Sequence, residues 1–160
     1  MAAPQPTRVT RWALRPIEQV YDVLSDPGTY PTWLVGCRDI RSVDDDWPAE
    51  GAHFHHRVGL VGPLTVNDST QALEAARPSH LALEVRFRPI GRGRVDFWLT
   101  DDPDRQGLVR TRIDMDEVPI GLLSTAAPAL APLIKGRNQS SLNSLVAFLN
   151  EDPTPRAERS

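Results

Sequence analysis

The last long hydrophobic pattern of the chain, over residues 128–150, has the period of an α-helix of about six turns. Its apolar side chains share one stripe, which consists of Leu130, Ile134, Leu145 and Phe148, with Leu142 and Leu149 on its shoulder. Asn138 and Ser141 fall on the same stripe. Because a buried amide or hydroxyl is costly without a hydrogen-bond partner, we expect the middle of this helix to face a cavity. The alternative is a helix rotated by about 40°, which places both polar groups against carbonyl oxygens at a sheet edge.

The N-terminal part of the chain predicts a strand, a short amphipathic helix and a helical wedge. Residues 7–14 alternate as a strand does. Residues 17–24 carry apolar side chains three and four positions apart, which indicates a helix that ends at the following proline–glycine turn. Residues 29–34 carry Tyr30 and Trp33 on about one helical turn. We expect these two aromatic side chains to lie between the first helix and the sheet.

Between the wedge and the long helix the pattern has a period of two, which is typical of β-strands. Short connections rich in glycine, proline and aspartate separate the apolar runs and favour antiparallel pairing of consecutive strands. The predicted strands are residues 38–44, 52–60, 64–75, 80–88, 94–101 and 108–118.

One face of the predicted sheet is apolar and the other is charged. Its apolar positions in the last three strands include Leu81, Leu83, Val85, Phe87, Val95, Phe97, Leu99, Val109, Ile113 and Met115. This face holds no arginine and only one hydroxyl, that of Thr111. The opposite face interleaves arginines with carboxylates, which predicts cross-strand ion pairs on a solvated surface rather than a binding patch.

The apolar segment 119–128 lies between the last strand and the long helix and has no clear period. A segment this hydrophobic is not expected to face water. It is either a lid over a cavity, with Gly121 as its hinge, or the first part of the helix.

Composition adds limits to this pattern. The chain has 160 residues, 40% of them hydrophobic, which predicts one domain over residues 7–150 with flexible termini at 1–6 and 151–160. The net charge of −3 and the scattered basic residues argue against a nucleic-acid or anionic-membrane partner. The single cysteine, Cys37, cannot form an internal disulfide, and the chain opens without a signal-peptide pattern, so we expect a cytoplasmic protein. No apolar run reaches the roughly 18 residues that span a bilayer.

Several short motifs, in their order along the chain, resemble the Bet v 1-like, START-related (SRPBCC) superfamily, and within it the polyketide cyclase/dehydrase and lipid-transport group. The matching stretches are Val20-Tyr21-Asp22-Val23-Leu24-Ser25-Asp26, Tyr30-Pro31-Thr32-Trp33, Gly51-Ala52-His53-Phe54, Arg77-Pro78 before Leu81-Ala82-Leu83, and Phe97 and Leu99 before Gly107-Leu108-Val109-Arg110-Thr111. The resemblance covers residues 7–150. It implies an α+β helix-grip fold, with a curved seven-stranded antiparallel sheet wrapped around the C-terminal helix and two short helices after the first strand. It also implies a hydrophobic cavity between sheet and helix, in which members bind apolar small molecules and some catalyse cyclisation or dehydration.

The densest titratable cluster is His53, His55 and His56. Strand phase places His56 on the apolar face. There it is either a proton donor or acceptor in the cavity or a core histidine bound to a backbone group. His53 and His55 share the outer face with Arg57, and no cysteine or carboxylate at a matching spacing completes a metal site. We therefore predict no metal and no cofactor.

The remaining candidates combine packing and polar roles. Tyr30 is the residue carried over from cyclase members, where aromatic and hydroxyl groups at the cavity mouth orient a polyketide. Arg137 lies beside the helix stripe, either as a solvated side chain or as a counter-ion for a ligand carboxylate. The residues expected to contact a ligand are Tyr30, Trp33, Phe54, His56, Leu83, Val85, Phe97, Thr111, Ile134, Asn138, Ser141 and Leu145.

Three functions follow from this pattern. The first is a carrier that holds a small hydrophobic molecule in the cavity. The second is a polyketide cyclase or dehydratase with His56 as general base and Tyr30 or Ser141 at the developing oxyanion. The resemblance implies an arginine in the cavity of cyclase members, and the absence of an arginine from the apolar face of this sheet weakens the hypothesis. The third is an interaction module with a collapsed cavity, in which the outward Trp98 anchors a homodimer or another partner.

Overall fold

The computed structural model describes residues 3–59, 62–87 and 91–151, without the side chain of Phe87. The prediction of flexible ends at residues 1–2 and 152–160 falls outside the described residues, as do the predicted strand ends at Leu60 and Arg88. The helical elements are α1 (Ile17–Leu24), η1 (Pro27–Thr29), α2 (Tyr30–Trp33), η2 (Gly121–Ala126) and α3 (Ala127–Asn150). The strands are β1 (Thr7–Ala13), β2 (Cys37–Val43), β3 (His53–Gly59), β4 (Thr65–Ala76), β5 (His80–Phe87), β6 (Gly91–Asp101) and β7 (Thr111–Ile120).

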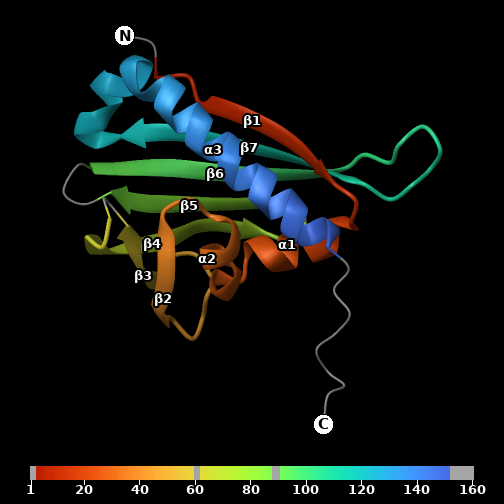
Figure 1. Ribbon diagram of the computed structural model, residues 1–160, viewed down its shortest axis with the longest axis horizontal. Helices are drawn as coiled ribbons and strands as arrows, with labels where there is room; N and C mark the ends of the chain where they lie inside the picture. Colours follow the sequence, from red (N-terminus) through yellow and green to blue (C-terminus); the bar gives the residue numbers. More distant parts are fainter. Residues whose placement is uncertain (1–2, 60–61, 88–90, 152–160) are drawn as a thin grey trace.

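The strands form one antiparallel sheet in the order β1-β7-β6-β5-β4-β3-β2. Strand β1 pairs with the last strand, so the chain segment α1–η1–α2 connects the two edges of the sheet. Helix α3 crosses one face diagonally, over β1 and β7 at one end and towards α1 and α2 at the other (Figure 1). This is the predicted α+β helix-grip fold, which the structure confirms.

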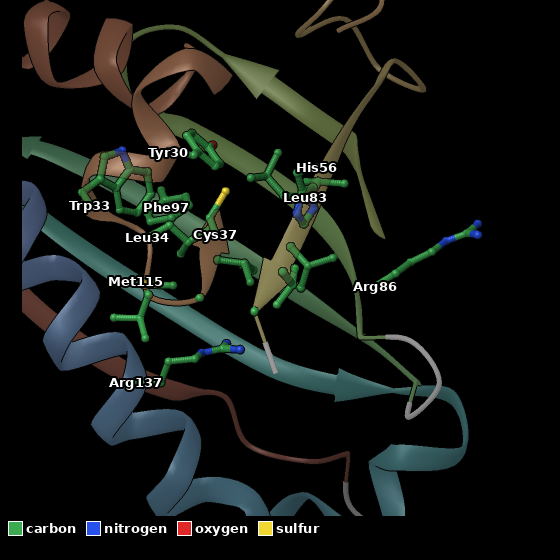
Figure 2. Close-up of a pocket in the computed structure, with 17 residues that line it drawn as sticks. Tyr30, Trp33, Leu34, Cys37, His56, Leu83, Arg86, Phe97, Met115 and Arg137 are labelled. Atoms are coloured by element: carbon green, nitrogen blue, oxygen red, sulfur yellow. The ribbon is translucent and has the colours of Figure 1, made fainter. Parts of the chain in front are cut away.

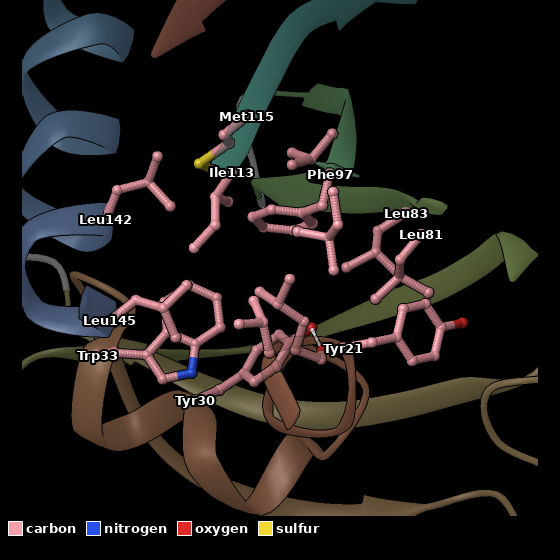
Figure 3. Close-up of a cluster of buried hydrophobic side chains, with 14 of the residues drawn as sticks. Tyr21, Tyr30, Trp33, Leu81, Leu83, Phe97, Ile113, Met115, Leu142 and Leu145 are labelled. Atoms are coloured by element: carbon pink, nitrogen blue, oxygen red, sulfur yellow. Dashed lines mark hydrogen bonds between the residues drawn. The ribbon is translucent and has the colours of Figure 1, made fainter. Parts of the chain in front are cut away.

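The face of the sheet towards α3, called the inner face here, follows the predicted alternation. Phe97 pairs with Met115 and Leu99 pairs with Ile113 in the β6–β7 register. All four side chains are buried. Phe97, Ile113 and Met115, with Leu83, form the floor on which the helices pack (Figure 3). On the outer face, Arg8 of β1 binds Asp116 of β7, which confirms that cross-strand ion pairs form there.

The seventh strand begins three residues later than predicted. β7 starts at Thr111, and Val109 lies before it with 57% of its surface exposed. The prediction that Val109 belongs to the buried face is wrong, because residues 102–110 form the connection between β6 and β7.

The segment before the long helix is helical. Residues 121–126 form η2, which leads directly into α3, and Gly121 adopts a left-handed conformation with φ of 67° where the chain turns out of β7. Leu122 is 96% exposed, so the expectation that this segment avoids water is wrong for that side chain.

Helix α3 is buried mainly in its C-terminal half. Ser141, Leu142, Leu145 and Leu149 are buried, whereas Leu130 and Ile134 of the predicted stripe are only partly buried. The N-terminal half therefore covers the sheet edge more loosely than the uniform stripe predicted.

The helical wedge lies where the sequence placed it. The ring of Tyr30 contacts those of Trp33 and Phe54 edge to face, at centroid distances of 4.8 Å and 5.1 Å. Trp33 in turn meets Phe97 of the sheet at 6.2 Å. This aromatic cluster fixes α2 against the inner face and closes the region under the C-terminal half of α3 (Figure 3). Among the helices built from the described residues, none combines the length and the apolar character of a membrane span.

Candidate functional site

A cavity of about 250 Å³ lies on the inner face of the sheet. Its walls come from α2 and the loop that follows it, from the sheet strands β2 to β7, and from Arg137 of α3 (Figure 2). Most of the lining atoms are apolar, so the cavity offers a water-poor space with few polar groups.

The structure brings six of the predicted ligand contacts together on this cavity. They are Tyr30, Trp33, His56, Leu83, Val85 and Phe97. They come from four elements that are far apart in the sequence. The alternation of the strands or the aromatic pattern of the helical wedge predicted each of these six residues.

The other six predicted contacts do not line the cavity. Phe54 is packed behind Tyr30 and Trp47, and Leu145 belongs to the hydrophobic core. The Thr111 hydroxyl donates to the carbonyl of Arg15 at 2.7 Å. Ile134, Asn138 and Ser141 all lie on α3, away from the cavity wall.

Asn138 and Ser141 are fully buried, and each has a protein partner. The Asn138 amide donates to Glu117 at 2.8 Å, and the Ser141 hydroxyl accepts from the backbone N–H of Val35 at 3.1 Å. Their polarity on the helix stripe is thus explained by hydrogen bonds to β7 and to the loop after α2. The interpretation that the middle of the helix faces a cavity does not fit these contacts.

Glu117 is a charged group of the inner face that sequence reasoning missed. Its side chain is 2% exposed, and it lies two residues beyond Met115 in β7, opposite Val95 of β6. Nη2 of Arg137 donates to both carboxylate oxygens of Glu117, at 2.6 Å and 2.5 Å. Continuing the strand alternation past Met115 was the signal that could have found it.

Arg137 therefore turns towards the sheet and borders the cavity, rather than lying on the solvated side of α3 (Figure 2). Its positive charge is balanced by Glu117, so the pair adds little net charge to the cavity wall. The pair also links α3 to β7.

His56 lies on β3 at the cavity and is 6% exposed. Its Nε2 is 3.1 Å from the Thr70 hydroxyl on the neighbouring strand β4. Burial lowers the pKa of His56. The neighbouring His55 also lowers it, whereas the negative charge of Asp68 raises it. The imidazole is therefore neutral at pH 7.

Tyr30 presents its ring to the cavity but not a free hydroxyl. Its O–H donates to the carbonyl of Leu24 at 2.6 Å. Complete burial raises the pKa of Tyr30 far above its ordinary value. The phenol therefore serves to hold α2 against α1, and it stays protonated.

Cys37, at the start of β2, is a further wall residue that sequence reasoning left out. Burial raises the pKa of its thiol to about 11, so the thiol is protonated at pH 7. It contributes a small, weakly polar surface, and as the single cysteine of the chain it is a convenient reporter of the cavity.

The two remaining histidines of the cluster face outward, as predicted. The rings of His53 and His55 are stacked 6.3 Å apart on the outer face. They border a shallow polar groove with Arg41 and Ser69 that is separate from the cavity.

A family model described as "Polyketide cyclase / dehydrase and lipid transport" matches residues 7–149. No curated protein matches the chain. Among solved structures, the chain is similar to CV1439 from Chromobacterium violaceum, with a TM-score of 0.68 and 21% identity over 93% of this chain and 100% of that one.

Two further solved structures share the fold of this chain. CalU16 from Micromonospora echinospora has a TM-score of 0.61 and 16% identity, over 90% of this chain and 75% of that one. DynU16, described as a protein in the dynemicin biosynthetic locus, has a TM-score of 0.64 and 15% identity, over 92% of this chain and 48% of that one. At these identities the likeness shows a shared fold.

Proposed function

Because this chain belongs to the polyketide cyclase/dehydrase and lipid transport family, we propose that it binds a small hydrophobic molecule in the cavity between its sheet and α3. The single observation that carries the proposal is the cavity of about 250 Å³, whose walls include the buried side chains of Trp33, Leu83 and Phe97 and the exposed Val35. A concave and mostly apolar space of this kind is the usual form of a small-molecule site. Burial of apolar ligand surface, worth about 25 cal/mol per Å², would supply the affinity.

The size and lining of the cavity limit the ligand. Pockets for drug-sized molecules measure about 300 to 1,000 Å³, so this one suits a molecule of one or two rings better than a long-chain lipid. The aromatic rings of Tyr30, Trp33 and Phe97 on its wall favour a flat apolar ligand.

We propose binding rather than turnover because the groups that a cyclase mechanism needs are occupied. The hydroxyl of Tyr30 donates to the carbonyl of Leu24, and Ser141, whose hydroxyl accepts from the N–H of Val35, does not line the cavity. The guanidinium of Arg137 is bound to Glu117. This leaves His56 as the one candidate of the cyclase hypothesis with an available polar atom at the cavity.

The interaction-module hypothesis assumed a collapsed cavity, and the cavity is present. The exposed Trp98, which that hypothesis used as an anchor, stacks on the ring of His80 at 3.7 Å. Its position on the outer face thus has a partner within the same chain.

The test uses tetralin, a two-ring hydrocarbon, and measures its dissociation constant by quenching of tryptophan fluorescence and by calorimetry. We expect a value between about 10 µM and 1 mM, given the size of the probe. The variant Val95→Phe places a larger side chain in the cavity wall and should abolish binding.

The matched control is Val43→Phe, the same substitution at an exposed position of β2 that does not line the cavity. It should bind tetralin as the wild type does. Absence of tetralin binding to the wild type, or equal binding to Val95→Phe that is folded by circular dichroism, would count against the proposed function.

A further inference from the structure

His56 has one imidazole nitrogen without a protein partner. Its Nε2 contacts the Thr70 hydroxyl, but its Nδ1 is buried and has no hydrogen bond to any residue that the structure describes. The residue is 94% buried, as its exposed fraction of 6% implies, and it lines the cavity. A buried polar atom of this kind requires a partner, and a molecule bound in the cavity that His56 lines is one source of it.

The contact with Thr70 decides which nitrogen carries the proton. Thr70 is 2% exposed, and over the described ranges 3–59, 62–87 and 91–151 its hydroxyl has no hydrogen-bond partner other than His56. If His56 donated to Thr70, the hydroxyl hydrogen would be buried without an acceptor. If Thr70 donates to Nε2, the hydroxyl and Nε2 are both satisfied, and the hydrogen of the neutral ring lies on Nδ1.

The charge of the ring is consistent with this arrangement. Burial in the apolar wall lowers the pKa of His56, and the attraction of Asp68 only partly offsets that effect. A neutral imidazole with Nε2 as acceptor offers a single donor, Nδ1–H, and no positive charge.

We propose that the Nδ1–H group of His56 donates a hydrogen bond to the carbonyl oxygen of the ligand, so that the cavity selects small cyclic ketones over hydrocarbons of the same shape. The inference rests on the proposed function, because it names the chemical class that this cavity takes. Thr70 acts as a positioning residue, since it sets the tautomer and does not touch the ligand oxygen itself. Arg137 borders the same space, with its charge already balanced by Glu117.

The binding test compares 1-tetralone with tetralin, which has the same two rings and no oxygen, and with 1-tetralol, which can also donate. A ketone can only accept a hydrogen bond, so it reports a donor in the wall. We expect the wild type to bind 1-tetralone about five to ten times more tightly than tetralin. The variant His56→Phe should bind both equally, while the control His55→Phe, on the outer face of the same strand, should keep the preference.

A second measurement does not depend on any variant. Nitrogen-15 chemical shifts of the imidazole ring, recorded on the wild-type protein at pH 7.5, distinguish a protonated from an unprotonated ring nitrogen. We expect the proton of His56 on Nδ1, and a change of the Nδ1 shift when 1-tetralone binds.

The outcomes separate this inference from the proposed function. Equal affinity for 1-tetralone and tetralin overturns the inference and leaves the binding function intact, because a water molecule would then satisfy Nδ1. Preference for 1-tetralol over both, or a proton on Nε2, also overturns it, because Nδ1 would be an acceptor. Binding of none of the three probes overturns the proposed function and the inference with it.

Discussion

Glu117 places a negative charge between β7 and α3, where its side chain is 2% exposed. Arg137 and Asn138 supply its hydrogen bonds, and the guanidinium of Arg137 balances its charge. A carboxylate in such surroundings is stable only while its partners are present, because an unpaired buried charge is costly.

Replacing Glu117 with glutamine should therefore destabilise the protein by about 2 to 3 kcal/mol. This is somewhat less than the loss expected from breaking a fully buried ion pair, because the Arg137 side chain is 29% exposed. Urea unfolding followed by circular dichroism measures the change. Asp22→Asn is the matched control, since its ion pair with Arg77 lies on the surface, and it should unfold at the same urea concentration as the wild type. A Glu117→Gln midpoint equal to that of Asp22→Asn would contradict the importance of this contact.

His56 should make stability depend on pH. Its pKa is lowered from 6.5 in the folded state, so below that pH the unfolded chain binds a proton more readily than the folded protein does. The stability that the neutral ring contributes is present above pH 6.5 and is lost as the pH falls towards the lowered pKa. Denaturant unfolding between pH 7.5 and 5 should show a steeper loss in the wild type than in His56→Gln. Parallel curves for the two proteins would argue against a depressed pKa.

At the residue scale, the sequence predicted which polar side chains are buried better than it predicted their hydrogen-bond partners. It identified Asn138 and Ser141 as polar positions on a buried stripe, and both are buried. A buried polar group is satisfied either by a cavity or by a protein atom, and the choice depends on which residues meet the helix. Those residues, Glu117 and Val35, are far away in the sequence, so local pattern alone did not decide between the two.

At the scale of the elements, α3 has two halves with different roles. Its C-terminal half packs on α2 and the inner face through Leu142 and Leu145, which are both 0% exposed. In its N-terminal half, Leu133 is 72% exposed to solvent. Arg137, where the two halves meet, lines the cavity.

Leu142→Ala should consequently cost about 3 kcal/mol of unfolding free energy, through lost burial and the space it leaves. Leu133→Ala on the same helix should change stability by less than about 0.5 kcal/mol. Thermal and urea unfolding of the two variants compare them directly. A larger loss for Leu133→Ala would mean that the N-terminal half of α3 is packed in solution.

The elements themselves were largely predictable. The period-two runs located all seven strands because one face of each is buried and the other is not. The pattern placed the start of the last strand at residue 108 because Val109 and Leu108 are apolar, yet both belong to an exposed connection. The alternation of apolar and polar residues cannot distinguish a strand from a long connection that carries exposed apolar side chains.

At the scale of the whole molecule, the order of the elements and motifs pointed to a family resemblance, and that resemblance implied the helix-grip fold with a cavity between sheet and helix. Its exact position was not predictable. The cavity lies nearer the loop after α2 and the ends of β3 and β5 than the middle of α3, and residues such as Gly36, Val58 and Thr70 line it. Those walls depend on strand register and helix angle, which arise from packing across the whole chain.

The central claim is that a small hydrophobic molecule occupies this cavity. The most direct measurement is the set of nuclear Overhauser effects between bound 1-tetralone and the methyl groups of the full-length protein. We expect contacts to Leu83 and Val95 on the cavity wall and none to the exposed Leu122 and Leu133. Contacts to Leu122 and Leu133 without any to Leu83 or Val95 would place the molecule on the surface of η2 and α3 and would contradict the claim.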